Sequence, residues 1–208
     1  MFLKTLRVGT IGNFCYLAGD EDGGNGVVID PAFDPDYIIS NIKKHGLDIT
    51  QIILTHHHFD HVNAAVAIKA RTGAAILAHK GCEPFLRGSV RIDISAVDGA
   101  EAAWQGKGRI EIMHTPGHSP GGLCLLIDDT WLITGDTLFI GNCGRTDLEG
   151  GDARALYTSL ERLKRLSDKL IVCPGHDYGP APSRTLGEEK RFNPALAAAT
   201  FEEFLAVP

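Results

Sequence analysis

Short apolar runs separated by glycine-rich turns dominate the first half of the chain, and this pattern predicts strands. Residues 13–17 and 27–30 flank such a turn and are expected to form a β-hairpin. A helix should follow, because Asp34 is a good N-cap, Pro35 suits the first helical position and Gly46 ends the apolar pattern.

The first half continues with a β-branched run over residues 51–54 that leads into a histidine-rich segment. A second helix is predicted over residues 62–71, with Gly73 at its end, and a strand over residues 74–78. Residues 81–108 have no clear periodicity and remain unassigned.

The second half repeats the order of the first. It predicts a strand over residues 110–114, a hairpin of residues 123–127 and 131–133, a helix over 152–166 and a strand over 170–173. Hairpin, helix, strand and histidine therefore occur twice along the chain. We expect an α/β protein built from two similar halves that face each other.

Composition narrows the class of protein. The chain has 208 residues, 44% of them hydrophobic, which suits one globular domain over residues 1–208. A net charge of −6 argues against nucleic acid or acidic membranes as partners, and no apolar stretch approaches the ~20 residues of a membrane span. The five cysteines lack C-x-x-C spacing and are typical of reduced thiols, so we expect a cytoplasmic protein.

Residues 56–61 hold four histidines and one aspartate. Neutral imidazole and carboxylate groups are the ligands that zinc and iron bind, and the cluster begins where a predicted strand ends. Open α/β sheets place their ligands at such strand ends. His118, Asp136 and His176 each follow a predicted strand as well, so the sequence predicts a metal site where these strand ends converge.

The motifs around these residues resemble those of the metallo-β-lactamase superfamily. Residues 55–61 match its T-H-x-H-x-D-H signature, and the T-P-G-H, T-G-D and P-G-H motifs ending in His118, Asp136 and His176 follow in the same order. The resemblance covers nearly the whole chain. It implies a four-layer αβ/βα sandwich with metals at one edge of the two sheets.

The resemblance also implies a ligand set for two divalent metal ions, with zinc expected and iron or a mixed pair as the alternative. His57 and Phe59 occupy variable positions of the motif and are not expected to be ligands. The implied ligands are His56, His58 and His118 for one ion and Asp60, His61 and His176 for the other, with Asp136 bridging the two.

A dinuclear site of this kind suits hydrolysis. Two metal ions that share a bound water provide a hydroxide at neutral pH and polarise the scissile carbonyl, so no serine or cysteine nucleophile is needed. Asp60 would hold a metal and orient the attacking water, which makes Asp60 and Asp136 the expected catalytic residues.

Outside the ligands, the chain resembles glyoxalase II-type enzymes, the hydroxyacylglutathione hydrolases. The T-P-G-H-S-P-G and G-N-C-G-R-T-D stretches carry this likeness. Arg145 and Tyr178 match residues that contact glutathione in that branch, so a small thiol or thioester substrate is expected, with glutathione as the candidate carrier. Asp147 stands where the family has an aromatic residue, and the family's longer C-terminal helical domain is missing. The identity of the thiol carrier is therefore left open.

Persulfide dioxygenases are the alternative, because their C-G-R-T-D, H-D-Y and E-E-x-x-x-N-P stretches are also similar to this chain. They use a single iron at positions matching His56, His118 and Asp136. The metal ligands do not separate the two activities, whereas Phe59 and the Ser119–Pro120 pair favour the hydrolase. A ligand-free scaffold, a nuclease and an exported β-lactamase fit the sequence less well, since every ligand is kept and neither a basic face nor a signal segment is visible.

Several other residues have ordinary structural interpretations. His79 and His114 are expected to be structural, His45 to lie at a helix end, and Cys143 to pack near the site rather than act as a nucleophile. Trp104 and Trp131 should belong to the core. Asp147 is a candidate for a carboxylate that orients a ligand histidine.

Overall fold

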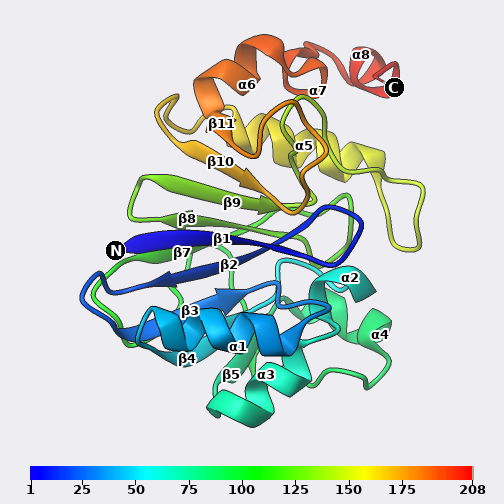
Figure 1. The fold of residues 1–208 in the computed structure, drawn as a ribbon. Helices are drawn as coiled ribbons and strands as arrows, with labels where there is room; N and C mark the ends of the chain where they lie inside the picture. The colour runs from blue at the N-terminus through cyan, green and yellow to red at the C-terminus, as the bar shows by residue number, and fades with distance from the viewer. Residues whose placement is uncertain (208) are drawn as a thin grey trace.

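Two β-sheets face each other at the centre of the computed structural model, which describes residues 1–207 (Figure 1). The six-stranded sheet has the order β1-β2-β3-β4-β5-β6 and the five-stranded sheet the order β11-β10-β9-β8-β7. The first sheet comprises β1 (Phe2–Val8), β2 (Asn13–Gly19), β3 (Gly24–Ile29), β4 (Leu47–Ile53), β5 (Ala75–Ala78) and β6 (Ile94–Ser95). The second comprises β7 (Ile110–His114), β8 (Leu123–Ile127), β9 (Trp131–Gly135), β10 (Ile171–Pro174) and β11 (Arg184–Thr185).

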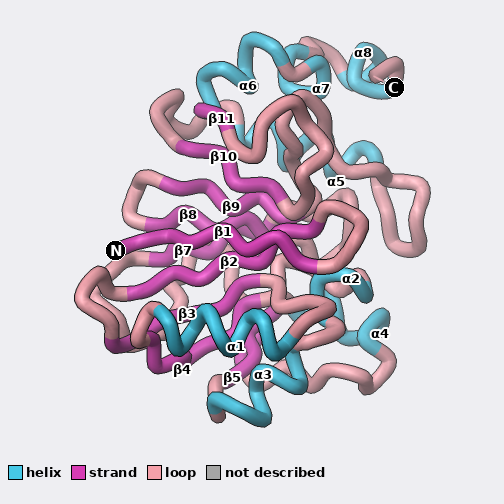
Figure 2. The backbone as a smooth tube through the Cα atoms, in the orientation of Figure 1, coloured by secondary structure: helices cyan, strands magenta, loops and turns pink. Residues whose placement is uncertain are grey.

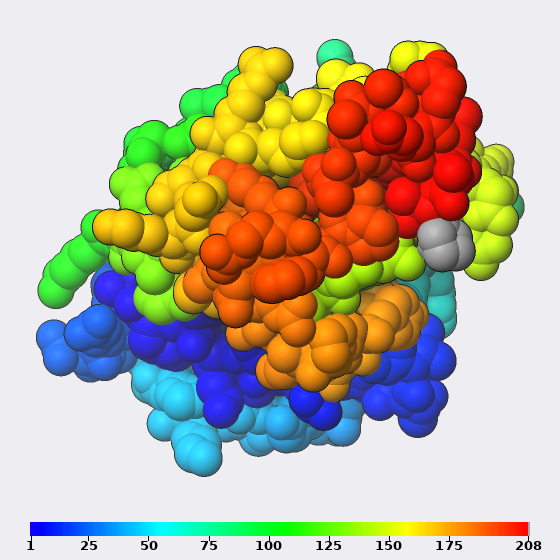
Figure 3. Space-filling model, turned by 90° about the horizontal axis from the view of Figure 1, so that it is seen from above, coloured from blue at the N-terminus to red at the C-terminus, as the bar shows by residue number. Residues whose placement is uncertain are grey.

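Helices cover the outer face of each sheet, so strands lie inside and helices outside (Figure 2). The first sheet is covered by α1 (Pro35–Lys44) and α3 (Ala65–Thr72), with α2 (Phe59–Val62), a 3₁₀ turn (Lys80–Cys82) and α4 (Glu83–Leu86) at one end. The second is covered by α5 (Ala153–Leu163), α6 (Leu186–Phe192), α7 (Pro194–Ala197) and α8 (Phe201–Leu205). Seen from above, the C-terminal segments (orange to red) lie beside N-terminal segments (blue) on the surface (Figure 3). The four-layer αβ/βα arrangement confirms the expected fold class.

Three hydrophobic clusters hold the four layers together. Along β2, Phe14 and Tyr16 point into the cluster between the two sheets, whereas Cys15 and Leu17 point into the cluster beneath α1 and α3. Successive side chains of a strand point to opposite faces, so a strand buried on both faces is a continuous apolar run. A third cluster joins the second sheet to its helices through residues such as Leu156. Trp104 belongs to the central cluster, and the partly buried Trp131 packs against it, as expected for core residues.

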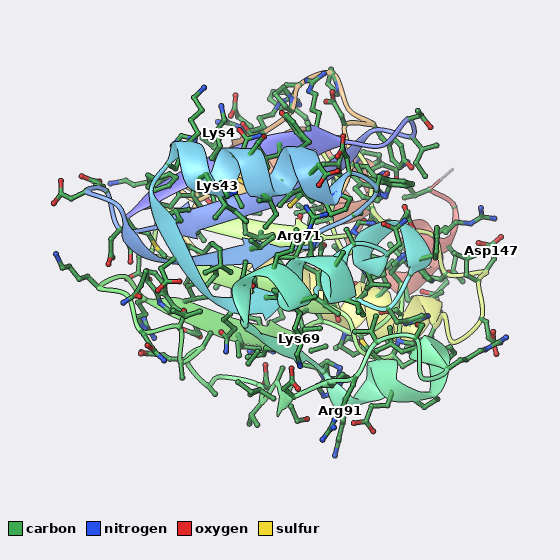
Figure 4. The ribbon with its side chains drawn as sticks, turned by 60° about the horizontal axis from the view of Figure 1, so that its bottom comes forward. Lys4, Lys43, Lys69, Arg71, Arg91 and Asp147 are labelled. Carbon is green, nitrogen blue, oxygen red and sulfur yellow. The ribbon has the colours of Figure 1, made fainter. Side chains whose placement is uncertain are left out.

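The helix boundaries predicted from capping residues are largely confirmed. Asp34 caps α1 by accepting a hydrogen bond from the Tyr37 N–H at 2.9 Å, and Asp152 caps α5 in the same way. His45 is the C-terminal cap of α1, and Gly73 ends α3 in the left-handed conformation at a φ of 74°. On the outer side, α1 and α3 carry basic residues (Figure 4), and Arg71 of α3 forms an ion pair with an aspartate of α1.

The single helix predicted over residues 62–71 is wrong. The chain forms the short α2 and then α3, with a break at Asn63 and Ala64. The Ala64 N–H donates to the Pro31 carbonyl at 3.2 Å, and the Asn63 side chain accepts from the Phe33 N–H. Because these groups bind the loop after β3, the backbone hydrogen bonds of a continuous helix are interrupted there. No helix among residues 1–207 has the length and apolar character that crossing a membrane requires.

The two halves of the chain share one topology, as their repeated pattern predicted. In each half, an antiparallel hairpin (β2–β3 or β8–β9) is flanked by an antiparallel strand (β1 or β7) and by a parallel strand (β4 or β10) that follows a helix. Cys15 and Cys124 lie on the equivalent strands β2 and β8. The parallel pairs β3–β4 and β9–β10 direct their carboxyl ends to one edge of the sandwich, where the predicted metal-binding residues follow them.

Gly117, in the T-P-G-H motif, allows the chain to pass close to α5. Its φ is +140°, and a Cβ atom there would lie 2.2 Å from the backbone nitrogen of Leu156. The backbone contact cannot relax by a side-chain rotation, so only glycine fits before His118.

We predict that Gly117→Ala lowers the free energy of unfolding by roughly 3 kcal/mol or more, because strain and a backbone clash add. Gly73→Ala is the matched control: its φ is also positive, but nothing lies within 4 Å of the added methyl, so about 1 kcal/mol is expected. Urea denaturation measures both. Equal losses in the two variants would show that the backbone contact at Gly117 is unimportant.

Candidate metal centre

The first group of predicted donors gathers where β4 ends. His56 and His58 lie between β4 and α2, and His118 comes from the loop after β7. One ligand atom of each of the three lies within 4.8 Å of the others. The His58 Nδ1 and His118 Nε2 atoms are 2.9 Å apart. This spacing suits three nitrogen ligands of a single metal ion.

A second group lies beside the first. Asp60 and His61 sit in the short helix α2, and His176 follows β10. Their ligand atoms are also within 4.8 Å of one another, with 3.1 Å between the His61 and His176 Nε2 atoms and 3.4 Å from His176 Nε2 to Asp60 Oδ2. A carboxylate and two imidazoles can therefore hold a second ion.

Asp136, directly after β9, joins the two groups. Its Oδ2 atom is 3.5 Å from His118 Nε2 in the first group and 3.4 Å from His176 Nε2 in the second. It also lies 4.0 Å from His56 Nε2. The structure thus brings together all seven residues that the sequence predicted, and one carboxylate reaches both groups.

His57 and Phe59 point away from these groups, as expected for variable positions of the motif. The His57 ring stacks on Phe85 with the ring centroids 4.3 Å apart, and Phe59 is 75% exposed. Burial lowers the pKa of His57 to about 4, so its ring is neutral at physiological pH.

Hydrogen bonds outside the two groups fix the ring tautomers. The Nδ1 atom of His61 lies 3.0 Å from Asp30 Oδ2, and that of His118 lies 2.8 Å from the Arg145 carbonyl. These oxygens accept hydrogen bonds, so each ring carries its N–H on Nδ1 and turns the Nε2 lone pair inward. His56 and His176 are held in the same way by the Thr55 hydroxyl at 3.0 Å and the Ile11 carbonyl at 3.3 Å.

The carboxylates and histidines of the site shift each other's pKa values. Burial raises the pKa of Asp60 and Asp136, but nearby histidines outweigh it and hold both values below the usual range. Burial lowers the pKa of His176, yet its hydrogen bonds to Asp136 and Asp60 raise the value to about 10. The pKa of His58 falls to about 4 through burial and the nearby His118. Positive charge is therefore favoured between the carboxylates.

Among the seven donor residues, two buried atoms lack a hydrogen-bond partner, His56 Nε2 and Asp136 Oδ1. The Nε2 atoms of His61 and His176 face each other at 3.1 Å although both rings have an acceptor for their Nδ1–H. Buried polar atoms without partners are costly, and two nitrogens that face each other can share at most one proton. Divalent cations bound here would satisfy these atoms, so the donor set fits metal ions.

Asp30 is a site residue that the sequence analysis missed. It is buried, and its carboxylate accepts from the Thr55 N–H at 2.7 Å and the Thr55 hydroxyl at 2.6 Å as well as binding His61. Since Thr55 in turn holds His56, one carboxylate orients a histidine in each group. The signal was available, because Asp30 follows strand β3 just as His56 follows β4. Asn13, also missed, donates to Asp60 Oδ2 at 2.9 Å.

A cavity of about 740 Å³ opens beside the two groups, a volume typical of ligand pockets. The expected substrate residues Arg145 and Tyr178 both line it. Tyr178 stacks on the His176 ring with centroids 4.4 Å apart. Cys143 lines the cavity too, but burial raises the pKa of its thiol to about 11, which argues against a nucleophilic role.

Asp147 does not orient a ligand histidine, so this expectation is wrong. Its carboxylate binds the Arg145 guanidinium through two hydrogen bonds of 2.6 Å, and both side chains are largely exposed. Figure 4 shows Asp147 at the periphery of the molecule. His118 is oriented instead by the backbone carbonyl of Arg145, a group that no sequence motif reveals.

Helix α6 holds one wall of the cavity in place. Glu189 is fully buried and accepts from the Gly141 N–H at 2.8 Å and from the Asn193 side chain at 2.9 Å. Asn193 also donates to the Phe139 and Asn142 carbonyls. The E-x-x-x-N-P stretch noted in the sequence thus fixes the loop that lines the cavity. His79 and His114 stack on each other away from the seven donors, as their structural interpretation predicted.

Residues 8–176 match the metallo-beta-lactamase superfamily, so the chain belongs to this superfamily of metal-dependent enzymes. Hydroxyacylglutathione hydrolase GloC of Haemophilus influenzae is 32% identical over 94% of this chain and 98% of its own length. The probable polyketide biosynthesis zinc-dependent hydrolase BaeB of Bacillus velezensis is 32% identical over 84% of this chain and 77% of its own.

Relatives with a different reaction are equally similar. The mitochondrial persulfide dioxygenase ETHE1 of Bos taurus is 32% identical over 93% of this chain and 75% of its own length. The crystal structure of ETHE1 from Myxococcus xanthus has a TM-score of 0.87 and 32% identity, covering 100% of this chain and 92% of that one. The relatives therefore include hydrolases and a dioxygenase on one fold.

We predict that Asp30→Asn lowers metal affinity by roughly 10- to 100-fold while leaving the fold intact, because a charge that orients His61 and Thr55 is lost but the shape is kept. Competition with a chromophoric chelator measures the affinity. Asp98→Asn is the control, since Asp98 binds the His114 N–H and Arg162 instead. An affinity equal to that of the unmodified protein would contradict the orienting role of Asp30.

Proposed function

We propose that the protein is a metal-dependent hydrolase that cleaves a thioester of the hydroxyacylglutathione type. The observation that carries the metal-dependent chemistry is the pair of donor groups that share Asp136. The choice of hydrolysis rests on Phe59 and the Ser119–Pro120 pair, which resemble the hydrolases. Two neighbouring ions suit hydrolysis. The similarity to GloC, which extends over nearly the full length of both chains, supports the same reaction.

The proposed ligands follow the two groups, with Asp136 contributing to both. Metal ions bound there would supply a hydroxide at neutral pH and polarise the scissile carbonyl. The proposed ligands are His56, His58 and His118 for one ion, Asp60, His61 and His176 for the other, and Asp136 for both.

The chain's own residues would set the geometry of the reaction. Asn13 holds the Asp60 carboxylate at Oδ2, which fixes the direction in which Asp60 orients the attacking water. In the reaction one water is consumed, a C–O bond forms at the acyl carbon and the C–S bond breaks, which yields a carboxylic acid and a thiol. The thiol of Cys143 stays protonated because of its raised pKa, so it does not compete as a nucleophile.

Substrate binding is assigned to the cavity that Arg145 and Tyr178 line. Tyr178 is 60% exposed and offers an aromatic face and a hydroxyl to a thiol carrier such as glutathione. Arg145 can bind a carboxylate of that carrier once it leaves Asp147, because an exposed ion pair stabilises by only about 0–1 kcal/mol. We place the protein in the cytoplasm, since its five cysteines are all unpaired.

A persulfide dioxygenase with one iron at His56, His118 and Asp136 is the second candidate. Its support is the likeness to ETHE1 in sequence and fold. Two histidines and one carboxylate form the ligand set that non-haem iron oxygenases use. Plasma mass spectrometry of protein purified without added metal separates the candidates: about two ions per chain, rich in zinc, supports the hydrolase, whereas about one iron supports the dioxygenase.

We predict that Asp136→Ala loses most metal from both positions and reduces hydrolysis of lactoylglutathione at least roughly 10³-fold, because the shared ligand is removed. His57→Ala is the matched control from the same segment, and its metal content should equal that of the unmodified protein. Metal content per chain and kcat report the result. The same metal loss in both variants would show that the ligand assignment is wrong.

We predict that Arg145→Ala raises KM for an anionic thioester roughly tenfold and changes kcat little, because the guanidinium binds the carrier and not the reacting atoms. Asp147→Ala should lower KM, since it releases Arg145 from its ion pair. Steady-state kinetics on glutathione thioesters measure both. An unchanged KM in Arg145→Ala would remove Arg145 from the substrate site.

A further inference from the structure

A second cavity, of about 610 Å³, adjoins the first at α2. Helix α2 contributes Phe59 and Val62 to its lining, and α4 contributes Phe85 and Leu86. Leu148, from the loop before α5, completes the apolar lining. Its volume falls in the range of small-molecule sites.

The two cavities share a wall at the candidate metal centre. His58, Phe59 and Leu148 line both of them, and His58 is one of the proposed ligands. A substrate whose reacting atom lies at the metal centre can therefore extend one part into each cavity. A thioester has this shape, because its acyl group and its thiol carrier leave the reacting carbon in different directions.

The chemistry of the two linings differs. The first cavity presents Arg145, Tyr178 and the carboxylates of the site. The charged residues that line the second, Arg87 and Glu149, form an ion pair of 3.3 Å with each other and are both exposed. The rest of the second lining is mainly aromatic and aliphatic, which disfavours a charged occupant and favours an apolar one.

Apolar side chains that face this cavity are unusually open to solvent. Phe59 is 75% exposed and Leu148 is 39% exposed. Phe85, which stacks on His57, is partly exposed as well. An apolar group that covers these side chains removes their surface from water, with a gain of about 25 cal/mol per Å².

We propose that the second cavity is the acyl subsite, and that the preferred thioesters carry an unbranched apolar acyl chain longer than a small hydroxyacyl group. This inference rests on the proposed thioester hydrolysis. The thiol carrier occupies the first cavity, and Phe59 contacts the acyl chain where it leaves the metal centre.

The test uses glutathione thioesters of acetyl, butanoyl, hexanoyl and octanoyl groups with the metal-loaded enzyme. If each buried methylene contributes its usual transfer free energy, kcat/KM rises roughly fourfold per methylene until the cavity is filled. Phe59→Ala should flatten this rise. Phe192→Ala is the matched control, because Phe192 is also a largely exposed phenylalanine (68%) but lies on α6 and outside this cavity.

A second variant fills the cavity without touching the metal ligands. Ser89 is exposed at the edge of the cavity, and its hydroxyl donates to the Leu86 carbonyl. Ser89→Trp should lower kcat/KM for the octanoyl thioester at least roughly tenfold and leave the acetyl thioester unchanged. Metal content is measured for every variant, so that a loss of metal in Phe59→Ala is separated from a loss of acyl binding.

The outcomes distinguish the two proposals. If neither these four thioesters nor lactoylglutathione is cleaved by metal-loaded enzyme, thioester hydrolysis is wrong, and the acyl subsite with it. If lactoylglutathione alone is cleaved, hydrolysis stands and the acyl subsite is overturned. If all four are cleaved with kcat/KM values within about twofold, hydrolysis stands and the acyl subsite is overturned. Equal losses for short and long chains in Ser89→Trp overturn it as well.

Discussion

The burial of Asp136 between two groups of histidines is the constraint on which the rest of the site depends. A buried carboxylate is stable only beside compensating positive charge, and one of its oxygens has no hydrogen-bond partner. Burial first, and then the neighbouring histidines, lower the pKa of His56 and of His58, so these rings do not supply that positive charge as protonated imidazoles. Metal ions held by the rings would balance the carboxylate without protonated rings. The Nδ1 atoms of His56, His61, His118 and His176 are each tied to an outer oxygen and leave Nε2 facing the site, whereas His58 turns its Nδ1 atom inward.

The sheets provide this arrangement through their strand ends. Parallel strands β3–β4 and β9–β10 deliver Asp30, His56, Asp136 and His176 to one edge of the sandwich. Close packing at this edge leaves no room for a side chain at position 175. A Cβ atom on Gly175 would lie 2.2 Å from Asp136 Oδ1. The hydrophobic clusters between the sheets and the helices fix the positions of these strand ends. The geometry of the site is therefore a consequence of the fold and not of the loops alone.

The surroundings of the metal centre decide what reaches it. One cavity combines the donors, Arg145 and Tyr178 with apolar side chains, and its wall is held by the buried Glu189–Asn193 pair, which binds the backbone there. The other is apolar and is built from α2, α4 and the loop before α5. The two meet at Phe59, beside the donors. A superfamily that performs several reactions with similar donor sets can therefore differ in substrate through the linings of such cavities.

The sequence by itself determined most of the strands, though not β6 or β11, together with the caps of α1 and α5, the repeated halves and all seven donors, because these depend on local periodicity and on short motifs. The break at Asn63, the orienting role of Asp30 and the orientation of His118 by the Arg145 carbonyl required the tertiary structure. So did the second cavity and the helix α6 that supports the first. Hydrogen bonds between segments far apart in the chain, and the packing of side chains across them, create these features, and no local pattern of residues encodes which distant groups will meet.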